Sequence, residues 1–335
     1  MRRDLKGKTC QELHDSDSLT LSRIFYYVVK PFMPDWFRLL LRRALVLVQQ
    51  KKYADVWPIF EPAAARPAQW PGWPRGKRFA LVLTHDVDTG AGNKKVPQLM
   101  ELDRSLGFAA SFFFVPEEYE HPDKHHDMLR RNGFEIGVHG LKHDGKLYQS
   151  ENAFNKSAVQ INHFIEKWNA AGFRAPCMHH NLAWHHRLNI LYDASTYDTD
   201  PFEPQGGGVG TIFPFTVTDH TTGHSYVELP YTLPQDYLLF EIMRQKTINI
   251  WRRKLDWIAD NGGMAHVLAH PDYMFFNDNG NNAGKYPALL YEELLRYIKD
   301  RYEGQYWLAT AQEVAAYWKS TQQQAGKVSK EMRGQ

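Results

Sequence analysis

Two carboxylates stand two residues apart after an apolar run, and this spacing suits metal or proton chemistry. Asp86 and Asp88 follow residues 79–83, which are continuously apolar. A buried strand of a parallel sheet would end here, at the edge where such sheets place their active sites. Further along, His139 and His143 follow a second strand-like run at a spacing that metal-binding histidines use. The sequence therefore predicts an Asp–His–His metal site with a second carboxylate beside it.

The residues around these motifs alternate between strand-like and helix-like patterns. Apolar runs typical of strands are found at 79–84, 110–115, 134–138, 264–269 and 306–309. Helical periodicity fills most of the intervals, and repeated strand–helix units over this length indicate a parallel, barrel-like α/β domain. One face of such a barrel would gather strand ends from distant parts of the chain. Arg174, Pro176 and His270 follow strand-like runs and would join the same face.

Taken together, the motifs resemble one family. Asp86-Val-Asp88, His139-x-x-x-His143, Arg174-x-Pro176 and Leu268-Ala-His270 have the order and approximate spacing of the polysaccharide deacetylases with a NodB-homology domain, also grouped as carbohydrate esterase family 4. The resemblance extends from near residue 75 to residue 320. It implies an α/β fold, a distorted (β/α)7-type barrel of the NodB/glycoside hydrolase-deacetylase kind, here with an N-terminal helical extension.

The resemblance also implies roles for the residues named above. Asp88, His139 and His143 would bind a divalent metal, typically Zn2+. Asp86 would be the general base, held ionised and oriented by Arg174. An amide carbonyl is a poor electrophile, so the ion must polarise it and acidify a water molecule, while the carboxylate takes the proton as that water attacks.

Further residues complete the implied site. The backbone N–H of Cys177, which follows Pro176, would help to stabilise the tetrahedral oxyanion, a task that does not depend on the side chain. His180 is close enough in sequence to line the substrate pocket. His270, on the opposite side, would protonate the leaving amine.

The chain departs from the family pattern in two places. Val87 separates aspartates that are more often adjacent, although side chains two apart on an extended chain still point to one face. The roles of base and ligand therefore stay open to exchange between Asp86 and Asp88. The family's Asp-Trp motif, expected before the final histidine, has no clear counterpart, and Asp198 and Asp200 are candidates without a tryptophan.

Four segments are expected along the chain. Residues 1–52 form an N-terminal helical extension, 53–78 a Pro- and Trp-rich linker, 79–320 the catalytic domain and 321–335 a disordered tail. Within the catalytic domain, residues 201–234 predict an inserted hairpin that would form a wall of the substrate groove.

The composition is that of an ordinary globular protein. Of 335 residues, 43% are hydrophobic and 23% are charged. A net charge of +2, without a Lys/Arg block, argues against nucleic acid as a partner. Cys10 and Cys177 lie far apart and the N-terminus has no signal-peptide pattern, so we expect free thiols and a cytoplasmic location.

Residues 36–50 predict an amphipathic helix whose basic side chains, Arg38, Arg42 and Arg43, share one stripe with two glutamines. Its unbroken apolar run is too short to span a membrane. Two roles agree with the pattern: packing on the catalytic domain, or peripheral contact with the anionic inner face of a membrane.

The sequence thus predicts a metal-dependent hydrolase of non-peptide amide bonds that removes N-acetyl groups from an amino sugar of a polysaccharide or glycan precursor. A small-molecule amidohydrolase on the same fold and a non-catalytic glycan-binding relative are alternatives. Asp86-Val-Asp88-Thr89 also resembles the haloacid-dehalogenase phosphatases, a reading that leaves the histidines without a role. The oligomeric state, the sugar and the metal stay open.

Overall fold

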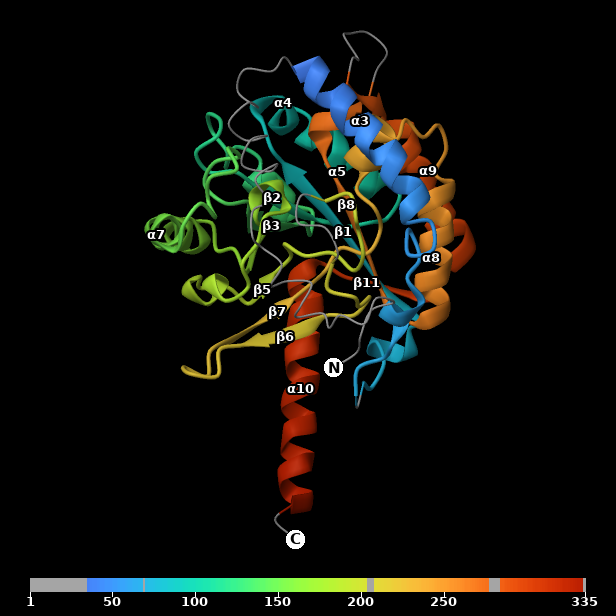
Figure 1. The fold of residues 1–335 in the computed structure, drawn as a ribbon. Helices are drawn as coiled ribbons and strands as arrows, with labels where there is room; N and C mark the ends of the chain where they lie inside the picture. The colour runs from blue at the N-terminus through green and yellow to red at the C-terminus, as the bar shows by residue number, and fades with distance from the viewer. Residues whose placement is uncertain (1–34, 69, 204–207, 277–283, 334–335) are drawn as a thin grey trace.

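A curled sheet of mostly parallel strands forms the centre of the molecule in the computed structural model, which describes residues 35–68, 70–203, 208–276 and 284–333 (Figure 1). β6 runs antiparallel to β7, and the other pairs in this sheet are parallel. The order across the sheet is β11 (Tyr306–Leu308), β1 (Phe79–Val87), β2 (Ser111–Phe114), β3 (Glu135–Val138), β4 (Gly172–Phe173), β5 (Tyr192–Asp193), β7 (Ser225–Glu228) and β6 (Phe215–Thr218), with β8 (Met264–Ala269) also paired to β1.

The segment that follows β7 connects the β7 end of the sheet to β8 and so to β1. The backbone N–H groups of Thr232 and Leu233 donate to the carbonyl of His266 in β8, at 3.1 and 3.2 Å. β8 in turn pairs with β1 from Ala80 to His85. The sheet therefore curls into the distorted parallel α/β barrel that the strand–helix alternation predicted.

Helices cover the outside of this barrel, and their sequences explain their bounds. α7 begins after Ser150, whose Oγ accepts from the Ala153 N–H, and α8 ends at Gly262, which has a left-handed φ of 72°. The α-helices are α3 (Asp35–Lys52), α4 (Gly90–Asn93), α5 (Val96–Ser105), α6 (His126–Arg131), α7 (Glu151–Lys167), α8 (Asn249–Asn261), α9 (Ala288–Tyr302) and α10 (Ala311–Arg333).

Short elements connect these helices and strands. They are the 3-10 helices η2 (Glu61–Ala64), η3 (Pro74–Gly76), η4 (Pro176–Met178), η5 (Trp184–Arg187) and η7 (Pro271–Tyr273), the π-helical turn η6 (Tyr237–Ile242), and the strand pair β9 (Met274–Phe275) and β10 (Tyr286–Pro287). Within the described residues, no helix has the length and hydropathy needed to cross a bilayer.

β1 is the central strand of the core, and all nine of its residues are buried. Neighbours pair with it along both edges, which is why its sequence is almost continuously apolar. The strand continues to Val87, beyond the predicted end at residue 84. Asp86 therefore lies within the strand, and Asp88 is the first residue after it.

The Pro- and Trp-rich segment, residues 53–78, packs on the domain. Trp73 is buried and its Nε1 donates to the Gly262 carbonyl at 2.8 Å. The Trp70 ring contacts those of Trp73 and Trp318, with centroids 4.8 and 5.1 Å apart. Aromatic contacts thus join this segment to α10 and make it part of the domain core.

Two expectations for the C-terminal half were wrong. α10 continues to Arg333, so residues 321–333 are helical rather than a disordered tail. β6 and β7 do form the predicted hairpin, but β7 runs parallel to β5. Their connecting turn therefore lies at the amino ends of the parallel strands (Figure 1). Asp86 and Asp88 lie at the carboxyl end of β1, so the turn cannot form a wall of their site. Residues 1–34 of the expected N-terminal extension lie outside the described residues.

Candidate metal centre

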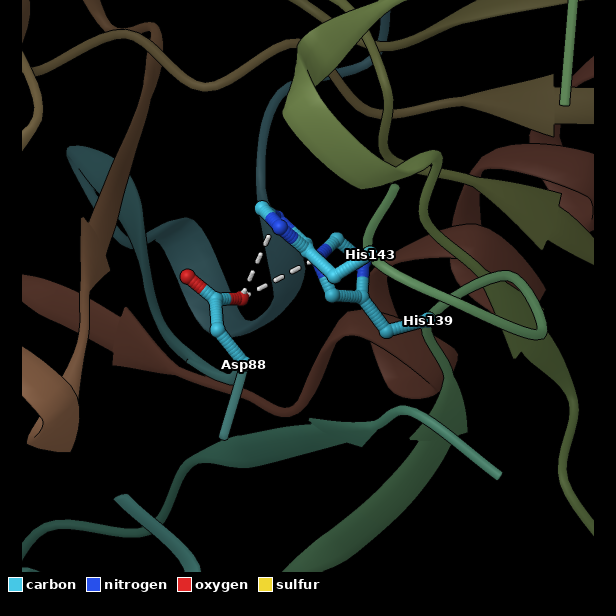
Figure 2. A group of neighbouring side chains, drawn as sticks. All are labelled: Asp88, His139 and His143. Atoms are coloured by element: carbon cyan, nitrogen blue, oxygen red, sulfur yellow. Dashed lines mark ion pairs between the residues drawn. The ribbon is translucent and has the colours of Figure 1, made fainter. Parts of the chain in front are cut away.

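Asp88, His139 and His143 come together at the carboxyl ends of β1 and β3 (Figure 2). One ligand atom from each lies within 4.8 Å of the other two. Asp88 Oδ1 is 3.3 Å from His139 Nε2 and 3.6 Å from His143 Nε2. Asp88 and His139 are buried, whereas His143 is partly exposed and leaves one side of the cluster open.

The sheet register explains why these side chains meet. Phe113 of β2 pairs with Asp86 on one side and with Gly137 of β3 on the other. β1 and β3 therefore end at the same level, one strand apart. Gly140 then turns the chain with a φ of 65°, and a Cβ at this position would lie 2.4 Å from Pro176 Cγ. A glycine is needed here to bring His143 back towards Asp88.

The cluster fits a divalent cation on two independent observations. His139 Nδ1 donates to the Arg174 carbonyl at 3.0 Å, so Nε2 is left with a lone pair directed at Asp88. Asp88 Oδ1 is buried and has no hydrogen-bond partner among the described residues. Buried polar atoms normally have such a partner, and an oxygen facing two imidazole nitrogens instead is the donor arrangement of a cation site.

The charge state of Asp88 also suits a ligand. Burial alone would raise the pKa of this carboxyl group, but nearby positive charge, that of His143 above all, outweighs it. The net effect holds the pKa of Asp88 well below its usual range, so the group is a carboxylate at neutral pH.

Asp86 reaches the same region from β1 and is held by a buried arginine. Arg174 Nη1 donates to Asp86 Oδ1 at 2.8 Å and to Thr84 Oγ1 at 2.9 Å, while its Nε donates to the Ala194 carbonyl. Arg174 is fully buried. The second carboxylate oxygen, Asp86 Oδ2, lies 3.7 Å from His139 Nε2 and faces the cluster.

His266 is a site residue that the sequence reasoning missed. Arg174 Nη2 donates to His266 Nε2 at 3.0 Å, and His266 Nδ1 donates to the Pro230 carbonyl at 3.2 Å. Burial, with the Arg174 charge, holds the pKa of His266 well below its usual value, so the ring is neutral. A signal was present: His266, within β8, and His270, directly after it, are four residues apart on extended backbone and therefore share a face.

Asp236 is the partner of His270. His270 Nδ1 donates to Asp236 Oδ1 at 2.6 Å, the His270 N–H donates to Oδ2 at 2.7 Å, and the Tyr286 hydroxyl donates to Oδ2 at 2.8 Å. Burial alone would lower the pKa of His270, but Asp236 and the carboxylates of Asp86 and Asp88 raise it to about 10.

The two aspartates suggested as this partner are engaged elsewhere. Asp198 forms a buried ion pair with Lys254, and Asp200 interacts with Glu203. The overlooked signal is the dipeptide Asp236-Tyr237, in which an aromatic residue other than tryptophan follows the aspartate.

The Arg-x-Pro motif continues into a turn beside His143. Cys177 and Met178 have φ values of 59° and 55°, which non-glycine residues adopt rarely. Cys177 Sγ is a free thiol 3.9 Å from both ring nitrogens of His143. Backbone strain of this kind is concentrated at functional sites.

His180 is buried and donates from Nδ1 to the Met178 carbonyl. It lies beside Tyr197 rather than in the Asp88–His139–His143 cluster.

Asp272 ties the β8 side of the site to Asp88. It accepts from the backbone N–H groups of Asp88 and Thr89, at 3.0 and 3.1 Å, and from the Thr89 hydroxyl at 2.5 Å. Burial and the nearby Asp88 carboxylate raise the pKa of Asp272 to about 6. A Cβ at Gly92 would collide with the Asp272 carboxylate, so this contact requires glycine there.

Comparisons with known proteins address the fold. No family model matches the chain, and no curated protein matches its sequence. Among solved structures, a protein from Mycobacterium smegmatis assigned as a polysaccharide deacetylase matches with a TM-score of 0.59 and 20% identity, over 77% of this chain and 96% of its own. The chain has the polysaccharide deacetylase fold.

Two further structures agree with the polysaccharide deacetylase fold. A protein from Pseudomonas aeruginosa PAO1 assigned as a polysaccharide deacetylase matches with a TM-score of 0.58 and 14% identity, over 73% of this chain and 92% of its own. The Puue allantoinase matches with a TM-score of 0.59 and 15% identity, over 77% and 95%. The fold thus occurs in proteins assigned to more than one activity, and the site must decide the function.

Proposed function

We propose that this chain is a metal-dependent hydrolase of non-peptide amide bonds, which removes N-acetyl groups from an amino sugar of a polysaccharide or glycan precursor. The observation that carries the proposal is the Asp88–His139–His143 cluster, with Asp86 and His270 beside it. The polysaccharide deacetylase fold supports the same class of reaction by analogy.

Asp88, His139 and His143 would hold the ion, and their one carboxylate and two imidazole donors suit Zn2+. A divalent cation bound there supplies Lewis-acid polarisation of the amide carbonyl and lowers the pKa of a water. The Arg174 carbonyl accepts from His139 Nδ1 and so fixes the tautomer in which Nε2 can bind the ion.

Asp86 would be the general base. Arg174 occupies Oδ1, so Oδ2 is the atom that receives a proton from the attacking water. The fully buried guanidinium fixes the orientation of this carboxylate. The backbone N–H of Cys177 would donate to the oxyanion, and Pro176 fixes the chain direction before it.

His270 would be the general acid. Its Nδ1 is held by Asp236, so Nε2 is the atom from which the proton passes to the leaving amine. Nε2 lies 3.9 Å from Asp86 Oδ2, so the proposed acid and base are close to each other.

We propose His180 as a residue of the pocket wall. The free thiol of Cys177 supports a cytoplasmic location.

A small-molecule amide is the second candidate substrate. It is favoured by the match to an allantoinase, whose TM-score equals that of the first deacetylase. The phosphatase alternative has less support, because Arg174 engages Asp86 and the barrel is of another fold class. A non-catalytic role is disfavoured by the filled positions of base, acid and metal ligands.

The test measures both the metal content of the protein and the release of product. We expect close to one zinc per chain by mass spectrometry, and acetate release from N-acetylglucosamine oligomers that stops after chelation and returns with zinc. Allantoin serves as the competing substrate. Zinc binding with hydrolysis of allantoin alone would replace the sugar proposal by the small-amide one, and no bound transition metal would overturn both.

A further inference from the structure

Helix α3 turns most of its large hydrophobic side chains towards solvent. Six of the eight large hydrophobic side chains that are exposed within the described residues belong to it, with exposed fractions from 39% to 73%. These six, which we call the α3 apolar face, are Phe37, Leu40, Leu41, Leu45, Leu47 and Val48. They recur at helical spacing and form a continuous stripe, a kind of surface that marks an interaction site.

The opposite, basic stripe of α3 fixes this orientation. Arg43 donates from Nε and Nη2 to the Glu241 carbonyl at 3.0 and 2.8 Å. The Arg42 guanidinium lies over the Tyr237 ring, 5.1 Å from its centroid, and Val46 is buried. Helix α3 therefore packs on the domain through its basic stripe, whereas an amphipathic helix usually packs through its apolar face.

Exposed cations lie at the end of α3 and near Glu241. Lys51 and Lys52 are exposed at the end of α3, and exposed Arg244 and Lys246 act electrostatically on Glu241, beside Arg43. No acidic residue occurs between positions 36 and 52. A partner for this surface must therefore combine an apolar interior with an anionic boundary.

We propose that the α3 apolar face docks on the surface of an anionic lipid bilayer. Protein interfaces carry about one hydrogen bond per 100–200 Å², and a stripe of leucine and valine side chains offers no polar atoms for them. A bilayer needs none, because an amphipathic helix inserts its apolar side among the acyl chains and its cations meet the headgroups.

The docked helix would lie beside the candidate site. Tyr237, under Arg42, follows Asp236 in sequence, and its ring centroid is 4.6 Å from that of Tyr273. Tyr273 in turn contacts the His270 ring at 5.3 Å. As a consequence that rests on the proposed function, the substrate is an amino-sugar glycan carried on a membrane lipid, presented where the bilayer meets the site.

The test uses the full chain and defined vesicles. We expect it to sediment with phosphatidylcholine vesicles that contain phosphatidylglycerol, less with phosphatidylcholine alone, and less at high salt. The triple variant Leu45→Ser/Leu47→Ser/Val48→Ser should lose at least about tenfold in vesicle affinity. The matched control is Val159→Ser/Leu289→Ser, which changes the two exposed large hydrophobic side chains that the described residues contain outside α3 and should bind as the wild type does.

Other occupants of the face give different results. If the wild type ignores anionic vesicles, or if the triple variant binds them equally well, the proposal is overturned. A dimer in light scattering that the triple variant dissociates, without vesicle binding, would assign the face to a second copy of the chain. Acetate release from a soluble oligomer is measured in parallel, and its absence counts against the proposed function alone because vesicle binding needs no catalysis.

Discussion

Asp236 and His270 form a buried pair joined by two hydrogen bonds, one from the ring and one from the backbone of the histidine. The ring bond is 2.6 Å long and holds Nδ1, which leaves Nε2 facing Asp86. The two residues are 34 positions apart, and neither lies within a strand, because His270 directly follows β8 and Asp236 directly precedes η6. This pair sets both the orientation and the protonation state of the candidate acid.

Replacing Asp236 by asparagine should lower the pKa of His270, so that less of the acid is protonated at neutral pH. His270 stays protonated in the wild type until the pH approaches its raised pKa of about 10. Without the Asp236 charge, the effect of burial dominates and the pKa falls, so the alkaline limb of the kcat profile should move down. We expect a kcat loss of about 100-fold at neutral pH.

Tyr286→Phe is the control for the Asp236 variant. It removes one hydrogen bond to Asp236 Oδ2 but keeps the carboxylate charge. Its alkaline limb should stay close to that of the wild type. An Asp236→Asn enzyme with an unshifted pH profile would show that His270 is not the acid.

The two aspartates can be separated by metal content. His143→Ala should lose metal and turnover together, whereas Asp86→Asn should keep the metal and lose turnover, because Arg174 rather than the ion holds Asp86. Mass spectrometry and acetate release measure the two properties. His163→Ala, on the exposed face of α7, should change neither. If Asp86→Asn lost the metal and Asp88→Asn kept it, the roles of base and ligand would be exchanged.

The site residues on or next to strands could be predicted, because the apolar sequence of each strand also shows roughly where it ends. Asp86, Asp88 and His139 lie within or directly after strands whose apolar sequences are unambiguous. Parallel strand ends then meet on one edge regardless of their separation in sequence. The placement of Asp88 and His139 follows from these two facts, whereas that of His143 also depends on the turn at Gly140.

The remaining features depend on contacts that no local pattern encodes. Asp236 lies in an irregular stretch between β7 and η6, so its direction is set by tertiary packing rather than by periodicity. The hydrophobic pattern of α3 distinguishes two faces but does not say which one is inward. The choice is made by the Arg43 bonds to Glu241, a residue 198 positions away.

His266 should act as a positioning residue for Arg174. His266→Phe removes the acceptor of Nη2 and leaves a buried guanidinium N–H without a partner, at a cost of about 1–3 kcal/mol in the free energy of unfolding. The freed arginine should also hold Asp86 less well, so kcat falls while KM and zinc content stay constant. Urea unfolding and steady-state kinetics measure the two effects.

His126→Phe is the matched control for His266. This histidine is also buried, and burial lowers its pKa to about 4, so it too is neutral. Its Nε2 has no hydrogen-bond partner among the described residues, and its ring packs on Phe114 and Trp168. The phenylalanine should therefore leave kcat unchanged and cost little stability. Equal kcat losses in both variants would mean that His266 has only a packing role.

Gly140→Ala should weaken metal binding by moving His143. The alanine would adopt an unfavourable positive φ and its Cβ would meet the Pro176 ring at 2.4 Å, so the turn from His139 to His143 must shift. Gly145→Ala separates the two causes, because Gly145 has a φ of 73° but open space where a Cβ would lie. We expect both variants to lose stability by about 1–2 kcal/mol from backbone strain. Only Gly140→Ala should also lose zinc affinity in chelator competition, and equal affinities in the two would show that the Pro176 contact does not position the ligand.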